Sequence, residues 1–239
     1  MGRLVKVCLL CFGAIALVPI AGVAWLYFNS SGLPDTDSLG KFAPATMAQV
    51  TDPCQKSSSV AIPYESIGDN LRDALGAAEG GEDGPGVLLR AVEGFHSLNR
   101  PRSTLSMRVS RSICYTPSRN LIRELNQIRV AVQLERHFSR RELFTIFANR
   151  TYFGENTFGV EAASRHFFSK EPNQLQIGEA ALLAGMVKSP SIFSPTKHTD
   201  RALRRRNEVI DAMVQAKSIS EVSAIDAKSS PLGLAIQEN

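Results

Sequence analysis

Cysteine is scarce in this sequence, with four residues among 239. Four cysteines are too few for a disulfide scaffold, and no C-x-x-C pair has the partner pair that a structural zinc site needs. The 17 glycines and 12 prolines are too few for a collagen-like or low-complexity chain. With 44% hydrophobic and 21% charged residues, the chain is neither a disordered tail nor a membrane protein with many spans. The length fits one domain, or one domain and a tether.

Charge is missing from the first part of the chain, over the 22 residues from Val7 to Phe28. An apolar run of this length can cross about 30 Å of hydrocarbon as a helix. Arg3 and Lys6 precede the run, and positive residues favour the cytoplasmic side. The sequence therefore predicts one N-terminal transmembrane helix with the rest of the chain outside the cytoplasm. A cleaved signal peptide is the alternative.

Helical spacing of apolar residues dominates the rest of the chain. The pattern from Ser118 to Phe138 predicts an amphipathic helix. A second helix is predicted to begin after Ser139, because Glu142 completes a capping box three residues later. Further helices are predicted at residues 159–168, 177–187 and 201–214. No segment alternates convincingly at period two, so the predicted fold class is mostly α.

These patterns divide the chain into four parts. Residues 1–28 form a cytoplasmic tip and membrane anchor, and residues 29–60 form a tether. A folded domain is predicted over residues 61–214, followed by a loose polar tail over 215–239.

Positive charge is concentrated in one part of the predicted domain. Residues 100–141 contain ten arginines, no lysine and two acidic residues, a net charge of +8. The planar guanidinium group suits phosphate or carboxylate and stays charged at any working pH. We call residues 100–141 the arginine window. Its charge predicts either an anion-binding surface or an ordinary solvated helix face.

The most specific motifs lie between residues 149 and 213. Asn-Arg-Thr-Tyr-Phe-Gly at 149–154 is followed by Phe-Gly-Val-Glu-Ala-Ala at 158–163, Gly-Glu-Ala-Ala-Leu-Leu-Ala-Gly-Met at 178–186 and Arg-Asn-Glu-Val-Ile-Asp-Ala-Met at 206–213. This series resembles the peptidoglycan glycosyltransferases (glycosyltransferase family 51), and the resemblance runs from about Ile62 to Met213. It implies a lysozyme-like, α-helical glycosyltransferase domain after the membrane helix. The short remainder after Met213 implies the monofunctional biosynthetic transglycosylase type, without a transpeptidase domain.

The resemblance also implies a location and partners. Family members polymerise lipid II at the membrane surface, which places this chain in the bacterial inner membrane with its domain in the periplasm. The implied partners are lipid II or polyprenyl pyrophosphate, the glycan strand, the membrane and other cell-wall synthesis proteins. Nucleic acid is not an expected partner, because the arginine window would face away from the cytoplasm. A disulfide between Cys54 and Cys114 is compatible with that compartment, and the sequence leaves it open.

The first catalytic element of the family is only partly present. In the family, a Glu in Glu-Asp-x-x-Phe-x-x-His-x-Gly takes a proton from the 4-hydroxyl of the acceptor sugar. A positioned base matters because a sugar hydroxyl is a weak nucleophile. The lead-in from Leu71 places this base on Glu79, with Glu82 as an alternative register. Gly80 replaces the Asp, and the Phe, His and Gly have no counterparts.

The second and third elements have also changed. The family's Gly-x-Ser-Thr-Ile-x-Gln-Gln, followed by a Lys, keeps only its Ser-Thr-apolar centre here. The family's Arg-Lys-x-x-Glu becomes Arg-Glu-Leu-Asn-Gln at 123–127, so that Gln127 replaces the second catalytic Glu. Glu124 could substitute only with rotation of the helix. The residues implied to bind substrate are Ser103, Thr104, Arg108, Arg111 and Arg123.

An amide at position 127 cannot carry the negative charge that Mg²⁺ requires. We therefore expect no certain metal or cofactor, with Mg²⁺ or Mn²⁺ as an option if the protein is active. Two hypotheses follow. In the first, the protein is a glycosyltransferase of lipid II that is weak or inactive as a polymerase, with Glu79 and Gln127 in the catalytic positions. In the second, it is a catalytically dead scaffold, a pseudoenzyme that docks onto cell-wall synthesis enzymes.

Overall fold

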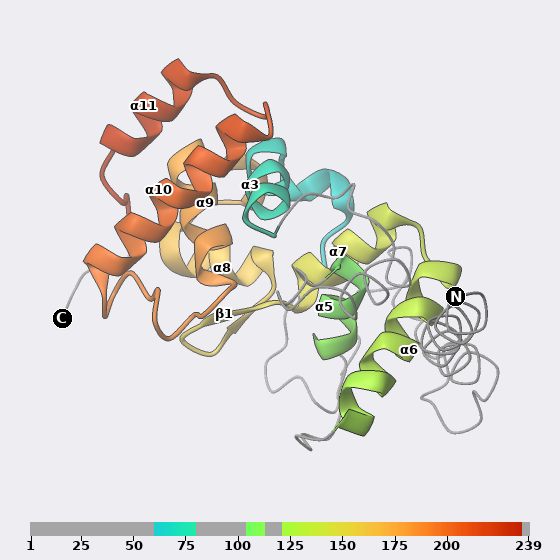
Figure 1. Cartoon of the computed structure of the whole chain (residues 1–239). Helices are drawn as coiled ribbons and strands as arrows, with labels where there is room; N and C mark the ends of the chain where they lie inside the picture. The colour runs from blue at the N-terminus through green and yellow to red at the C-terminus, as the bar shows by residue number, and fades with distance from the viewer. Residues whose placement is uncertain (1–59, 80–103, 113–120, 236–239) are drawn as a thin grey trace, which may run out of the picture.

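The computed structural model describes residues 60–79, 104–112 and 121–235 (Figure 1). The helices in these ranges are η1 (Tyr64–Ile67), α3 (Asp69–Glu79), α5 (Leu105–Ser112), α6 (Leu121–His137), α7 (Arg140–Arg150), α8 (Val160–Phe168), η2 (Pro172–Gln174), α9 (Ile177–Met186), α10 (Thr199–Gln215) and α11 (Glu221–Ser229). One small sheet joins β1 (Tyr152–Gly154) to β2 (Thr157–Phe158). The prediction of a mostly α fold is confirmed, and the helices predicted from residue 139 onward begin and end within two residues of their predicted bounds.

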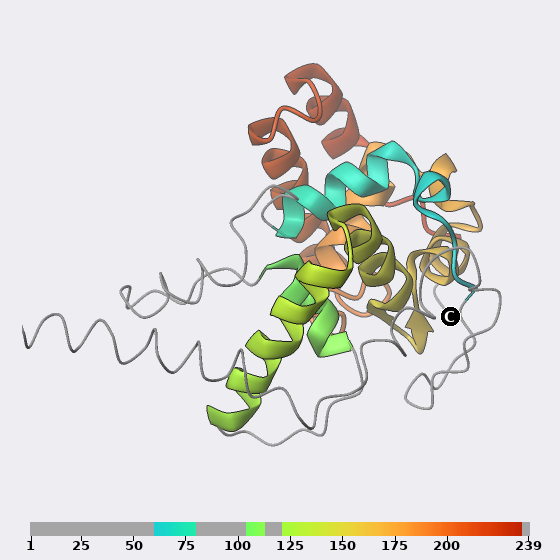
Figure 2. The ribbon, with the colours of Figure 1, turned by 90° about the vertical axis from the view of Figure 1, so that its right-hand side faces the viewer.

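Helix α9 forms the centre of the domain. Every residue from Glu179 to Met186 is buried, and α3 and α10 both pack against this helix. A helix that is apolar on all sides is stable only when other elements surround it. Figures 1 and 2 show α5 and α6 at the side of the domain opposite α11, with α7 between them and the α9 core.

The start of α7 confirms the predicted capping box. The Glu142 backbone N–H donates to Ser139 Oγ (3.3 Å), and the Ser139 N–H donates to Glu142 Oε2 (2.8 Å). The two bonds satisfy donors that the helix itself leaves unpaired. Because α7 begins at a defined residue, the buried run from Leu143 to Asn149 faces the core in one register.

The β1–β2 hairpin was not predicted. Its strands have three and two residues, which is too short for period-two alternation to be visible. Glu155 and Asn156 form the turn with φ angles of 50° and 58°. Two consecutive positive φ angles twist the chain in the sense that a tight antiparallel hairpin needs.

The prediction of a loose polar tail was wrong for the segment after Gln215. Helix α11 occupies Glu221–Ser229 and buries Ala224 and Ala227. The buried Arg206 of α10 donates to the carbonyls of Lys228 and Ser230, at 2.8 Å each. The Ala235 N–H then donates to the Phe167 carbonyl (2.8 Å). These interactions depend on small side chains and backbone groups, which leave little trace in hydropathy.

No helix in the described ranges is long and apolar enough to cross a membrane. The predicted anchor and most of the predicted tether, residues 1–59, lie outside the described residues, as do Cys54 and Cys114.

Candidate functional site

Thr104 directly precedes α5 and acts as its N-cap. The Met107 N–H donates to Thr104 Oγ1 (3.3 Å), and this hydroxyl also lies 2.9 Å from Ser106 Oγ. Side-chain oxygens of threonine at this position satisfy a free N–H of the first helical turn. Thr104, predicted to bind substrate, therefore has a structural role that fixes where α5 begins.

Ser106 ties α5 to α6. Its Oγ donates to Glu135 Oε1 (2.6 Å), and only 1% of Ser106 is exposed. On another side of α5, Met107 packs against a small apolar cluster of Ala131 and Val132. Because a polar and an apolar contact act together, the register between the two helices is fixed, and so is the direction in which Arg108 and Arg111 leave α5.

Arg108 and Arg111 stand three residues apart on α5, so their side chains lie on adjoining parts of one helix face. Burial, and to a smaller extent the positive charge of Arg111, lowers the pKa of Arg108 to about 10. Arg111 is exposed. An anion between the two guanidinium groups would relieve their mutual repulsion.

A third arginine holds the end of α5. Arg150, at the end of α7, donates from Nη2 to the Ser112 carbonyl (3.0 Å). A cation at a helix C-terminus is favourable, because the last carbonyls of a helix carry partial negative charge. Helix α5 is therefore held between α6 and α7.

Gln127 lies on α6, the helix that packs against α5, and it is half-buried. The structure thus places Gln127, Arg108 and Arg111 on two neighbouring helices. Glu79 is the last residue of α3, and its side chain lies outside the described part, as do the Arg123 side chain and all of Ser103. A common cleft for Glu79 and Gln127 stays a prediction.

Gln127 itself is a poor ligand for a divalent cation. The amide oxygen of Gln127 is neutral, whereas Mg²⁺ and Mn²⁺ prefer carboxylate oxygen. Within the described ranges, no three His, Cys, Asp or Glu side chains are grouped in a way that could hold a metal ion. We therefore assign no step of the chemistry to a metal.

Sequence reasoning missed a polar cluster around the hairpin turn. Glu155 accepts hydrogen bonds from Ser194 Oγ (3.1 Å) and from Thr196 Oγ1, and its second oxygen lies 2.9 Å from His166 Nε2. Burial raises the pKa of Glu155, but these hydrogen bonds and the nearby His166 outweigh burial and hold the pKa below its usual value. The cluster joins the hairpin to α8 and to the loop before α10. Its members are far apart in sequence and form no motif, so only the fold brings them together.

Comparison with known families places the chain in one of them. The family model described as Transglycosylase matches residues 45–214. This range includes α5, α6, the hairpin turn and nearly all of α10.

The most similar relatives are larger proteins. Penicillin-binding protein 1F of Bacillus subtilis is 32% identical over 136 residues, covering 57% of this chain and 19% of the relative. Penicillin-binding protein 1A of Aquifex aeolicus is 28% identical over 218 residues, covering 84% and 30%. Penicillin-binding protein 1A of Escherichia coli is 33% identical over 119 residues, covering 50% and 14%. The chain thus spans less than a third of the length of each of these relatives.

A solved structure is also similar. The crystal structure of penicillin-binding protein 1A from Haemophilus influenzae matches with a TM-score of 0.38 and 25% identity, over 56% of this chain and 17% of that one. The match to the family model, which spans well over half of the chain, identifies the family. The protein belongs to the transglycosylase family, the peptidoglycan glycosyltransferases whose motifs its sequence carries.

Proposed function

We propose that this protein is a membrane-anchored, periplasmic member of the family that binds lipid II or polyprenyl pyrophosphate and is weak or inactive as a glycan polymerase. One observation carries the proposal. The cations Arg108 and Arg111 are present on α5, while the neighbouring helix α6 carries an amide, Gln127, where the family has a carboxylate.

Binding is supported by the electrostatics of α5. Two arginines on one helix face repel each other. A pyrophosphate group offsets this repulsion, because guanidinium groups bind phosphate oxygens through paired, charge-assisted hydrogen bonds. We therefore assign Arg108 and Arg111 to the pyrophosphate of the lipid, with Arg123 as a further candidate.

Catalysis requires more than binding. The 4-hydroxyl of the acceptor sugar attacks the anomeric carbon of the donor, its proton passes to a base, and polyprenyl pyrophosphate leaves. A positioned base contributes about 10²–10⁴-fold, and Glu79 is the proposed base. A leaving pyrophosphate gains negative charge, which Arg108 and Arg111 would stabilise. With Gln127 in place of a carboxylate, the site keeps these cations but loses one of its two acidic groups.

Polymerisation of lipid II by the full-length protein in detergent tests the proposal, with glycan chains separated on gels. The wild type is expected to give few or no long chains, and Gln127→Glu to give more. Glu79→Gln in the Gln127→Glu background should abolish that gain. Long chains from the wild type that vanish in Glu79→Gln would refute the claim of weak activity.

Binding is measured separately, as the amount of polyprenyl pyrophosphate that the protein retains in detergent micelles. Removal of both arginines, in Arg108→Ala with Arg111→Ala, is expected to weaken retention at least tenfold and to make it indifferent to salt. The control is Lys217→Asn, an exposed cation just after α10 whose φ of 59° asparagine tolerates. Unchanged retention in the double variant would show that the two arginines do not bind the pyrophosphate and belong to an ordinary solvated helix face. A topology reporter fused after Asn239 tests the periplasmic location.

A further inference from the structure

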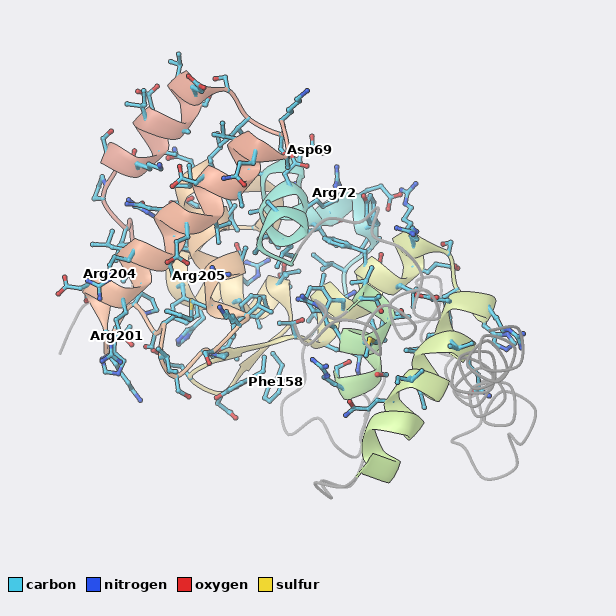
Figure 3. The ribbon with its side chains drawn as sticks, in the orientation of Figure 1. Asp69, Arg72, Phe158, Arg201, Arg204 and Arg205 are labelled. Carbon is cyan, nitrogen blue, oxygen red and sulfur yellow. The ribbon has the colours of Figure 1, made fainter. Side chains whose placement is uncertain are left out.

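A second cationic surface lies far from α5 in the sequence, on the loop after α9 and the first turns of α10. Residues 187–206 contain six Lys or Arg and one Asp. Four of these cations are exposed: Lys188, Lys197, Arg201 and Arg204. Figure 3 shows Arg201 and Arg204 together at one end of α10, pointing away from the body of the domain. We call these four residues, with Ile192, the α10 basic surface.

The cations of this surface have no acidic partners within the described parts of the chain, whereas several other cations do. Arg165 pairs with Glu161 and Glu171, and Lys228 pairs with Asp211. On α10 itself, Arg205 pairs with Glu208 (2.8 Å). Among the described residues, no ion pair involves Lys188, Lys197, Arg201 or Arg204.

Their position also opposes the helix dipole. Arg201 and Arg204 stand in the first turns of α10, where free N–H groups already give partial positive charge. Cations at this end cost stability. An anion from outside the domain would offset this cost.

An exposed apolar residue lies in the same loop as two of these cations. Ile192 is 47% exposed, in the loop between Lys188 and Lys197. The loop is held in place by Ser194 Oγ, which donates to Glu155 (3.1 Å), and by Phe193, whose ring lies 6.0 Å from the Arg205 guanidinium carbon. The hairpin beside this loop presents Tyr152, which is 42% exposed and stacks on Phe158 at 4.7 Å. The fold therefore holds an exposed isoleucine in a loop that carries two exposed lysines.

We propose that the α10 basic surface docks onto an anionic lipid bilayer. Its lysines and arginines contact lipid phosphates, and Ile192 enters the boundary between headgroups and acyl chains. Cations beside an exposed apolar side chain are typical of peripheral membrane binding. There, electrostatic attraction to anionic headgroups and burial of apolar surface in the bilayer both contribute. A soluble polyanion would use the cations and leave Ile192 in water. This inference is independent of the α5 site, because it needs no pyrophosphate.

A tryptophan at position 192 reports the docking directly. Trp25 is the only tryptophan in the chain, so full-length Trp25→Phe with Ile192→Trp has a single fluorophore at the surface. The protein is reconstituted into vesicles of phosphatidylcholine alone or mixed with phosphatidylglycerol. In the anionic vesicles we expect blue-shifted emission and quenching by brominated acyl chains, both reversed by high salt. Equal emission and quenching in the two kinds of vesicle would overturn the proposal and leave a soluble acidic partner as the alternative.

Charge removal provides the second arm of the test. Each cation near an anionic surface contributes about fivefold to the docking equilibrium. Arg201→Gln with Arg204→Gln is therefore expected to lower that equilibrium about 25-fold, read from the quenched fraction. Lys217→Asn, which removes one charge near the other end of α10, is the control and should change it less than twofold. A double variant that docks as well as the control would refute the role of these arginines. Circular dichroism confirms that each variant remains folded.

Discussion

Arg206 holds the C-terminal segment against the domain, and Arg206→Met tests how much stability this provides. Only 2% of Arg206 is exposed, and its guanidinium donates to the carbonyls of Lys228 and Ser230. Met keeps most of the apolar stem but donates no hydrogen bond. Each carbonyl left without a donor costs about 1–3 kcal/mol when buried. Removing the desolvated charge returns part of that cost, so the expected net loss is about 2–4 kcal/mol.

For a domain of this size, each kcal/mol lowers the melting temperature by about 2–4 °C. Arg206→Met should therefore melt roughly 10 °C below the wild type when followed by circular dichroism. Hydrogen exchange should be faster in Glu221–Ser229, since this is the helix that loses its anchor. Arg204→Met is the matched control, an exposed arginine on the same helix. Equal melting of the two variants, or a loss of stability with no faster exchange in α11, would refute the reasoning.

Three further predictions concern the turn, a glycine and the α5–α6 contact. The pKa of Glu155 is held below 4.5, the usual value for a glutamate, so its hydrogen bonds stabilise the fold above that pH and this contribution is lost as pH falls through the lowered pKa. Chemical unfolding should show Glu155→Gln less stable than the wild type by about 1–3 kcal/mol at pH 7, with a gap that narrows toward pH 3; a constant gap would contradict this. Gly159→Ala should destabilise, because φ is 81° and the new methyl would lie 2.7 Å from the Asn149 carbonyl oxygen, whereas Gly76→Ala, with nothing within 4 Å, should stabilise by about 0.5–1 kcal/mol. Ser106→Ala should cost about 1 kcal/mol, and an unchanged melting curve would show that its bond to Glu135 contributes nothing.

The helices could be predicted from sequence because their signals are local. The Ser139 and Glu142 pair marks the start of α7 three residues apart, and α9 is a continuous apolar run. The family resemblance was equally accessible, since its motifs are contiguous. The hairpin and α11 were missed because the strands are short and α11 buries only Ala224 and Ala227.

The substrate-binding and catalytic roles assigned to the candidate site stay predictions, and the structure adds where some of these residues lie. Arg108 and Arg111 lie together on α5 as expected for neighbours on a helix. Thr104 was predicted to bind substrate, yet its hydroxyl caps α5, a role that depends on where the helix begins. The cluster around Glu155 joins residues up to 41 positions apart, and no local pattern links a turn to a loop at that separation.

The hydrogen bonds of Arg206 show that the boundary of the family match and the boundary of the folded unit are different. The family match ends at residue 214, which is the boundary that sequence relationship defines. The folding unit extends further, because Lys228, Ser230 and Ala235 supply bonds to residues inside the matched range. A protein shortened to the matched range would keep the motifs at 149–213 and lose the two carbonyls to which Arg206 donates. Recombinant domains and fusion joints should therefore be placed after residue 235.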